Sequence, residues 1–311
     1  MDNMNIRTDK RANQKIKWTA IGKLLIFAAV LLLPVGCVKD DLYNTPHPDK
    51  GAVKVTTDWS GRSSDAVLPD SYVLRIGDKE QTVSGETNAF STLFAPGGQD
   101  LLVWHNAEGT TVGGTTATIN TLPDGTLEPM PGYLFSAARE LDIVKDDTLR
   151  VTVPMKQYIR RLVLTLKLNP GDELRISSTA ATLTGIASAT NLATGELVGS
   201  EGKTVIPAFA LATDAYAPES RATGQPVLSA TLHLMGVIIG ERQMLTLEIM
   251  LTGGGVQTVS TDLTEMLKNF RTDDDKEPLV LDASLELPVE VEAGATITDW
   301  DVVDNGDIKV N

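Results

Sequence analysis

Hydrophobic and polar residues alternate over much of this chain, which is the two-residue period of a β-strand with one buried face. The clearest run is Arg161 to Leu168, in which every second residue is leucine. The same period recurs in residues 245–251 and 279–287, and more weakly in 53–56, 72–76, 101–104 and 149–153. Turn sequences rich in glycine, proline and aspartate separate these runs. The pattern therefore predicts β-strands, each with one face buried, over most of the chain.

One segment has helical spacing instead. Leu263, Met266, Leu267 and Phe270 would share one face of a helix over residues 261–270, which either Thr261 or Asp262 can cap. A single short helix among strands that recur about every ten residues indicates an all-β fold of sandwiches and not a parallel α/β sheet.

The strand pattern also suggests where the domains meet. We expect a boundary between Pro154 and Tyr158, after the strand that ends at Val153. Residues 51–156 then form an N-terminal β-sandwich domain and residues 157–311 a C-terminal β-sandwich domain that contains the short helix. Each would hold about seven strands.

The first 36 residues differ from this pattern. Basic residues between Lys10 and Lys23 precede the apolar run Leu24 to Leu33, which leads through Pro34, Val35 and Gly36 to Cys37. The apolar run is too short to span a membrane and is typical of a secretory signal peptide. Cys37 is the only cysteine in the chain, and its position after the run indicates a bacterial lipobox. The alternative is an ordinary signal peptide or an uncleaved anchor with an incidental Cys37.

A lipobox implies that residues 1–36 are removed and that Cys37 becomes an acylated first residue. Several acyl chains anchor a protein stably, because each buried methylene contributes about 0.8 kcal/mol. Lys39, Asp40 and Asp41 then resemble the signal that exports lipoproteins to the bacterial surface in Bacteroidetes, although they could also be a charged, solvated tether. Residues 37–50 contain two prolines and no periodicity, so we expect a lipidated tether there.

The charge of the chain limits its partners. The net charge is −14, and it becomes −18 without residues 1–36, with 21 basic against 39 acidic residues. Nucleic acid is excluded as a partner because phosphate binding needs a basic stripe. An acidic body also does not favour binding to an anionic membrane, so the lipid would provide the attachment.

Candidate chemistry is sparse. The sequence lacks the hydrolase, metalloprotease and phosphate-loop motifs, so we expect no enzyme, no catalytic residue and no cofactor. His47 lies in the tether, and we expect His105 and His233 on the surface of strands. Acidic runs at 273–275 and at Asp299, Asp301, Asp304 and Asp307 suggest calcium, but solvated acidic loops fit them better than a metal site.

Several short motifs carry a family resemblance. They are the lipobox, Lys39-Asp40-Asp41, residues 94–97 before the strand 100–104, residues 183–189 followed by 192–196, and the ending Ile297-Thr298-Asp299-Trp300. In this order and spacing they resemble the fimbrillin-associated anchor proteins of Bacteroidetes, which anchor the major or minor fimbriae.

The resemblance implies two tandem β-sandwich domains of transthyretin-like topology. It also implies an outer-membrane lipoprotein, exposed at the cell surface, that anchors a fimbria (pilus) and limits its growth. The partners would be fimbrial shaft subunits, which in this superfamily assemble by strand exchange. The candidate exchanging or capping segments are Gly51 to Trp59 and Glu290 to Asn311. Both could instead be ordinary edge strands. Cleavage after Arg62 would separate the body from its lipid, so we expect the first strand to stay attached.

Two other functions remain open from the sequence. A surface glycan-binding lipoprotein would also combine a lipidated linker with tandem β-sandwiches, but its sugar platforms need exposed aromatic residues. Trp59, Trp104 and Trp300 lie at strand ends or within apolar alternation. A secreted hydrolase would need a nucleophile or a pair of acids that the sequence does not supply.

Overall fold

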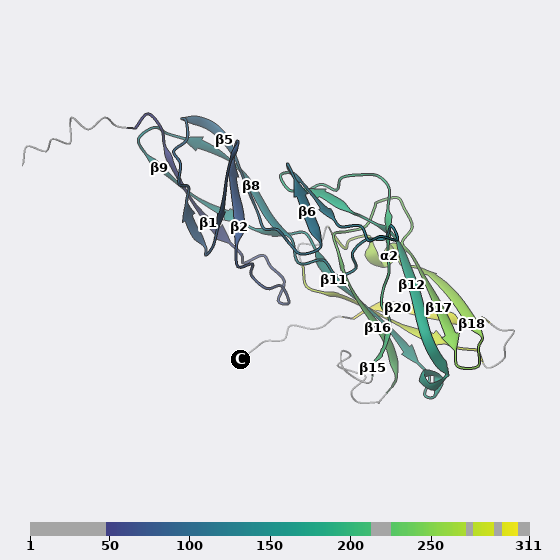
Figure 1. Cartoon of the computed structure of the whole chain (residues 1–311). Coiled ribbons are helices and arrows are strands. Elements are labelled where there is room, and N and C mark those ends of the chain that lie inside the picture. The colour runs from purple at the N-terminus through teal and green to yellow at the C-terminus, as the bar shows by residue number, and fades with distance from the viewer. Residues whose placement is uncertain (1–47, 213–224, 272–275, 289–293, 304–311) are drawn as a thin grey trace, which may run out of the picture. The chain divides into compact units, whose positions relative to one another are not determined.

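Strands dominate the structure, a computed structural model that describes residues 48–212, 225–271, 276–288 and 294–303 (Figure 1). Residues from Pro48 onward form one compact unit. The predicted all-β class is confirmed, and each alternating run of the sequence lies in a strand. None of the helices in the described part of the chain has the length and apolar character needed to cross a bilayer.

The first half of this unit contains two β-sheets. One has the strand order β4-β1-β9 and the other the order β10-β8-β5-β2-β3. Their inward-facing side chains form one hydrophobic core, in which Val53, Leu74 and Phe135 are fully buried. The strands are β1 (Ala52–Asp58), β2 (Tyr72–Ile76), β3 (Lys79–Val83), β4 (Thr87–Ala89), β5 (Gly97–Trp104), β8 (Phe135–Ile143), β9 (Thr148–Pro154) and β10 (Lys156–Gln157).

A hairpin in the middle of the first half pairs with the second half. Strands β6 (Thr110–Gly113) and β7 (Thr116–Ile119) form a sheet of order β13-β7-β6 with β13 (Ala189–Asn191). The side chains of Ala117 and Ile119 are buried in the same core as the leucines of the second half. The hairpin therefore joins the two halves through both backbone pairing and apolar packing.

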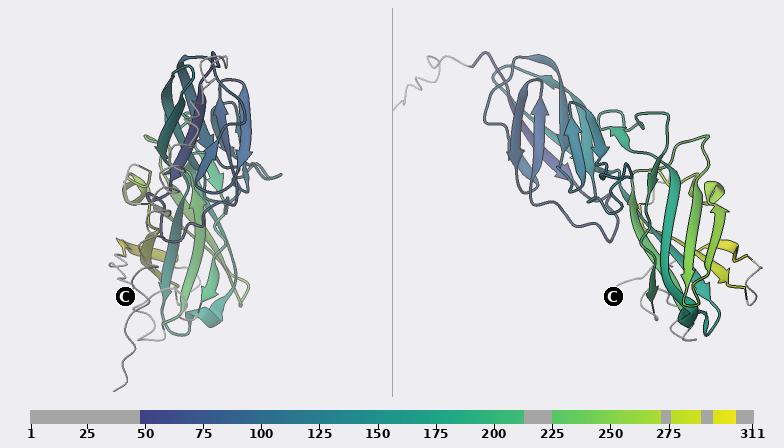
Figure 2. Two further views of the ribbon diagram at one scale, coloured as in Figure 1. Left: turned by 90° about the vertical axis from the view of Figure 1, so that its left-hand side faces the viewer. Right: turned by 45° about the vertical axis from the view of Figure 1, so that its right-hand side comes forward.

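The second half contains a five-stranded sheet of order β15-β16-β11-β19-β20 and a four-stranded sheet of order β14-β12-β17-β18, which share a single core. Figure 2 shows the strands of this half from two further sides. The elements are β11 (Arg160–Leu168), the 3-10 helix η2 (Asp172–Arg175), β12 (Ile176–Ile186), β14 (Lys203–Val205), β15 (Ala210–Ala212), β16 (Val227–Leu234), β17 (Met244–Leu251), β18 (Val256–Asp262), α2 (Thr264–Leu267), β19 (Leu279–Glu286) and β20 (Thr296–Val302).

Strand β11 departs from the expectation of one buried face. Its leucines are buried as predicted, but Val163 and Thr165 on the other face are only 6% and 4% exposed. β11 is the middle strand of its five-stranded sheet, between β16 and β19. A central strand can be covered on both faces, which the alternation of leucine with other residues does not reveal.

The predicted helix is shorter than its periodicity suggests. Thr261 and Asp262 do not cap a ten-residue helix, because both belong to β18 and pair with β17. The helix α2 spans only Thr264–Leu267. Asp262 nevertheless accepts a hydrogen bond from the Thr264 backbone N–H at 2.9 Å. Leu263, Leu267 and Phe270 are buried and Met266 is partly buried, so the four predicted apolar residues do face the core, although only Met266 and Leu267 lie within α2.

Candidate functional site

The residues predicted to carry the lipid and the export signal lie outside the described residues. These are Cys37, Lys39, Asp40 and Asp41, together with His47 in the tether. The described chain begins at Pro48, and strand β1 starts four residues later. The candidate site is therefore built from β1, which follows the tether directly, and from the loop that leaves β1.

Strand β1 is held on both sides. It pairs antiparallel with β4 and parallel with β9, so it is the middle strand of its sheet and not an edge strand. Val53 and Val55 on its inner face are fully buried, and Thr57 is 3% exposed. Gly51 at its start has no room for a side chain, because a Cβ there would lie 2.3 Å from the Val144 carbonyl oxygen. The segment from Gly51 to Trp59 is thus fully integrated in its own sandwich.

Trp59 directly follows the last residue of β1 and is buried. Its indole N–H donates a hydrogen bond to Thr57 Oγ1 at 2.8 Å. Its ring meets Tyr72 and Phe135 edge-on, with centroids 5.8 Å and 5.4 Å away. Aromatic edge contacts of this kind stabilise a core beyond the area that they bury.

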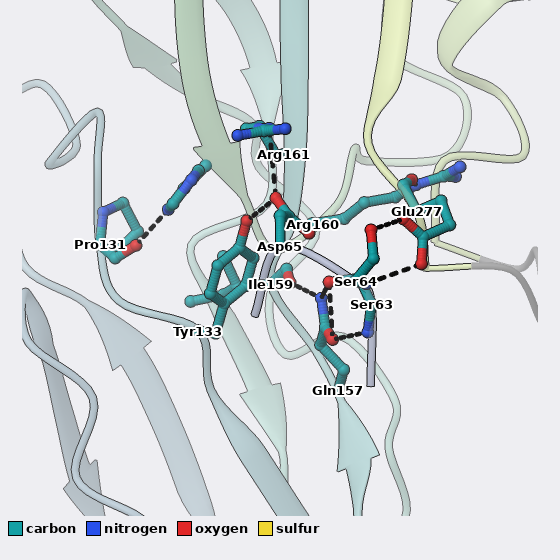
Figure 3. A network of polar contacts seen from close by, with 11 residues as sticks. Ser63, Ser64, Asp65, Pro131, Tyr133, Gln157, Ile159, Arg160, Arg161 and Glu277 are labelled. Carbon is teal, nitrogen blue, oxygen red and sulfur yellow. Dashed lines mark hydrogen bonds and ion pairs between the residues drawn. The ribbon is translucent and has the colours of Figure 1, made fainter. Parts of the chain in front are cut away.

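The loop after β1 is fixed by polar contacts with distant segments (Figure 3). The backbone N–H of Ser63 donates to Gln157 Oε1 at 2.8 Å, and the Gln157 amide donates to Ser63 Oγ and to the Ile159 carbonyl. Ser63 and Gln157 are 2% and 1% exposed. Because these polar groups are buried and satisfied, breaking any one of these hydrogen bonds is costly.

The next residue continues the attachment. The backbone N–H and the hydroxyl of Ser64 donate to the two carboxylate oxygens of Glu277, at 2.7 Å and 2.5 Å (Figure 3). The Glu277 carbonyl in turn accepts a hydrogen bond from Arg160 Nε at 2.6 Å. Glu277 precedes β19, so this contact links the loop to the second half.

Asp65 lies at the centre of a third contact. The Tyr133 hydroxyl donates to Asp65 Oδ2, and Arg161 Nε forms an ion pair with the same oxygen at 3.2 Å (Figure 3). Among the residues that the structure describes, Asp65 Oδ1 is buried without a hydrogen-bond partner. Burial and the hydrogen bond to Asp65 raise the pKa of the Tyr133 phenol above its ordinary value. Tyr133 is therefore a donor that stays protonated.

His105 follows the end of β5 and His233 lies in β16, as expected, but both side chains are half-buried. His233 Nδ1 donates to the Pro131 carbonyl at 2.8 Å, and its ring lies 4.7 Å from that of Tyr133. Burial lowers the pKa of His233 below its ordinary value. His105 packs against Phe135, and burial lowers the pKa of His105 to about 4. Each imidazole packs against an aromatic ring, so alternation in the sequence underestimates its burial.

A half-buried arginine, Arg271, binds the segment that contains β13. Arg271 donates to the Met235 carbonyl at 2.9 Å, to Thr190 Oγ1 at 2.7 Å and to the Gly195 carbonyl. Its guanidinium also lies over the Tyr158 ring, 5.5 Å from the centroid. Burial lowers the pKa of Arg271 below its ordinary value. These contacts give Arg271 a structural role close to the sheet that β6 and β7 share with β13.

The acidic runs form no recognisable metal site where the structure describes them. Asp299 and Asp301 lie in β20, whereas residues 273–275, Asp304 and Asp307 fall outside the described residues. Within the described ranges, no group of three or more histidine, cysteine or acidic side chains is placed to hold a metal ion.

Part of the segment from Glu290 to Asn311 is described. It contains β20, which pairs antiparallel with β19 at the edge of the five-stranded sheet. Asp299 has φ +51° at an irregularity in this pairing. β20 is thus an edge strand paired within its own sheet, which was the alternative to an exchanging segment. A further strand could pair with its outer edge.

The sequence alone did not identify the residues that fix the loop. Asp65, Tyr133, Gln157, Arg161 and Glu277 lie far apart in the chain and share no motif. Only Arg161 stood within a predicted strand. The fold brings these side chains together, so no spacing signal could have revealed the network.

Comparisons with known proteins agree with the fold. The family profile described as fimbrillin-A associated anchor proteins Mfa1 and Mfa2 matches residues 44–306. Comparison with curated protein sequences gives no match.

Solved structures show the same architecture at low identity. The fimbrial anchor protein Mfa2 from Porphyromonas gingivalis is 9% identical, with a TM-score of 0.57 over 81% of this chain and 97% of that one. A candidate adhesin from Bacteroides ovatus is 11% identical, with a TM-score of 0.58 over 83% and 96%. A candidate polysaccharide-binding protein from Bacteroides thetaiotaomicron is 10% identical, with a TM-score of 0.56 over 82% and 99%. Because the family profile spans most of the sequence, the chain belongs to the family of fimbrillin-A associated anchor proteins Mfa1 and Mfa2.

Proposed function

We propose that this protein is a lipoprotein of the outer membrane that anchors a fimbria at the cell surface. Cys37 carries the lipid, and Lys39, Asp40 and Asp41 direct the protein to the outer surface. The observation that carries the proposal is the position of β1. The strand that follows the tether directly is the middle strand of its sheet, so the tether is attached to the core of the first sandwich and not to a loose end.

The proposed domain organisation follows the function. Residues 1–36 are the signal peptide, 37–50 the lipidated tether, 51–156 the N-terminal domain and 157–311 the C-terminal domain. The pairing of β7 with β13 supports a firm connection between the two domains, because a force on one is then transmitted through a hydrogen-bonded hairpin as well as through the covalent chain.

The position of β1 also supports a role in limiting fimbrial growth. A subunit that loses its first strand opens a groove into which a neighbour can insert a strand through main-chain hydrogen bonds. In this protein β1 fills its place with buried Val53 and Val55. As long as β1 stays attached, no strand of a shaft subunit can replace it, and assembly stops on that side.

Binding to a shaft subunit then requires another edge. We assign it to the free-end segment from Glu290 to Asn311, whose described part includes β20. The outer edge of β20 is unpaired in the sheet order of the described residues. Strand exchange with a shaft subunit would extend the five-stranded sheet at this edge.

Glycan binding is the second candidate, since a structurally similar protein from Bacteroides thetaiotaomicron is described as a candidate polysaccharide-binding protein. The tryptophans argue against a sugar platform here. Trp59 and Trp104 are 8% and 5% exposed, and Trp300 is partly buried. Capture experiments separate the two functions, because retention of fimbrial subunits supports the anchor and retention of polysaccharide supports the glycan binder.

The lipid attachment is tested directly by cell fractionation. In Cys37→Ser the acylation site is lost, so we expect the protein to move from the membrane fraction to the soluble fraction. Substituting alanine for Lys39, Asp40 and Asp41 is the matched control, since the protein should then remain in the membrane fraction but lose its exposure to protease on intact cells. Retention of Cys37→Ser in the membrane fraction would contradict the proposed role of Cys37.

A further inference from the structure

Each of the two sandwiches contains one long parallel ladder. β1 pairs in parallel with β9 through seven residue pairs, from Ala52 with Thr148 to Asp58 with Pro154. β11 pairs in parallel with β19 through seven residue pairs, from Leu162 with Leu279 to Leu168 with Leu285. The other strand ladders of the described residues are antiparallel.

The first ladder lies directly on the covalent path through the protein. The tether leads into the start of β1, and the end of β9 leads through Met155 and β10 into β11. A pull on the tether therefore draws β1 toward its amino end, while a pull on the second half draws β9 toward its carboxyl end. Because the two strands are parallel, these forces act along the strands in opposite directions.

Such a load shears the ladder and does not peel it open. In a parallel ladder the hydrogen bonds are evenly spaced along both strands, so shear loads them together, whereas peeling loads them one after another. Bonds at both ends of the ladder are present: Ala52 N–H donates to the Asp147 carbonyl and Met155 N–H to the Asp58 carbonyl, each at 2.8 Å.

The neighbours of β1 oppose the same movement. Sliding β1 along β9 would also break its pairing with β4, where Phe90 N–H donates to the Val53 carbonyl at 3.0 Å. It would draw the fully buried Val53 and Val55 out of the core. The loop after β1 is bound to Gln157 and Glu277, so the second half holds this end of β1 as well.

We propose that β1 and β9 form a mechanical clamp, which resists a pull between the tether and the second half by shear. The proposal rests on the proposed anchoring function for its role on the cell. Its geometry stands independently, because it needs only the strand order and direction. The function is to bear force: the first sandwich stays folded while the fimbria that it holds is under tension.

Single-molecule pulling tests the clamp by applying force to the same folded protein in two directions. The protein is the chain from residue 37 onward with Cys37→Ser, so that added cysteines are its only handles. The shear variant carries Lys50→Cys and Lys156→Cys, at the start of β1 and just beyond the end of β9. The peeling variant carries Lys50→Cys and Lys145→Cys, which lie at the same end of the ladder, since Asp146 N–H donates to the Lys50 carbonyl at 3.1 Å.

We expect the first rupture of the ladder at a force at least about twofold higher in the shear variant than in the peeling variant, at equal pulling speed. Equal thermal unfolding temperatures of the two variants establish that the fold is the same. Equal rupture forces in the two directions, or a lower force in shear, would overturn the clamp. The result is distinct from that of fractionation with Cys37→Ser, since a clamp can exist in a protein that is not lipidated and a lipidated protein can lack the clamp.

Discussion

Asp65 shows how a single side chain can depend on partners that come from distant parts of the sequence. It accepts a hydrogen bond from Tyr133 and forms an ion pair with Arg161, 96 positions further along the chain. Removing one member of such a half-buried network leaves the others unsatisfied, at a cost of about 1–3 kcal/mol. The network therefore fixes the loop after β1 more firmly than the polar composition of that loop suggests.

The protonation of Tyr133 makes this network sensitive to alkaline pH. Its pKa is raised in the folded state, so its contribution to stability is fully present below the unfolded pKa of about 10 and is lost as pH rises above that value. We expect the free energy of unfolding of the wild-type protein to fall more steeply between about pH 10 and 11 than that of Tyr133→Phe. Urea unfolding over this range measures the difference.

Tyr72→Phe is the control for this titration, since it removes a phenol outside the network. A wild-type slope equal to that of Tyr133→Phe would show that Tyr133 does not hold its proton.

Gly185 is required for its conformation and for its close contacts. It has φ +74°, and a Cβ there would lie 2.7 Å from the Arg242 carbonyl oxygen. Gly171 has φ +97°, but no described atom beyond its own residue and chain neighbours lies within 4 Å of the position that its Cβ would take. We expect Gly185→Ala to destabilise the fold by about 2 kcal/mol or more, which lowers the thermal midpoint by about 4–8 °C. Gly171→Ala should cost less, because only the backbone strain applies, and equal midpoints for the two variants would argue against the steric contact.

At the scale of elements, the sequence predicted the positions of the strands better than their pairing partners and the number of their buried faces. The alternation in residues 245–251 corresponds to β17, with Leu245, Leu247 and Ile249 fully buried. It could not show that β11 is covered on both faces, because the period is the same in either case. The β6–β7 hairpin pairs with β13 through a contact some 70 residues away in sequence. Periodicity describes one strand at a time, and pairing partners depend on the whole fold.

The loop after β1 should resist cleavage after Arg62. A protease needs an extended, mobile segment, and Ser63, Ser64 and Asp65 are each bound to another part of the protein. In Glu277→Ala both hydrogen bonds that Ser64 donates to the Glu277 carboxylate, one from its backbone N–H and one from its hydroxyl, are lost. Loss of about 1 kcal/mol of hydrogen bonding should raise the rate of cleavage by an arginine-specific protease about fivefold.

Glu248→Ala is the matched control for this cleavage. Glu248 is an exposed residue in β17, so its removal should leave the rate unchanged. Equal cleavage rates for Glu277→Ala and the wild-type protein would indicate that the loop is protected by something other than Glu277.

At the scale of the whole molecule, the structure concerns the folded body of the protein, whereas the proposed lipid concerns its attachment to the membrane. The family assignment and the fold follow from residues 44–306, whereas the attachment to the membrane depends on Cys37, which precedes them. The sequence motif predicts the attachment, and the position of β1 explains how it would be transmitted to the body. An anchor needs both the lipid at Cys37 and a body to which β1 transmits the attachment.

The most direct measurement is the distribution of fimbriae between cells and medium. Cells that produce the wild-type protein should keep their fimbriae, whereas cells that produce Cys37→Ser should release most of them into the medium, with this protein at the end of each released filament. Immunogold labelling and quantification of shaft protein in the two fractions measure both effects. If fimbriae on Cys37→Ser cells stay attached in wild-type amounts, the protein is not their lipid anchor.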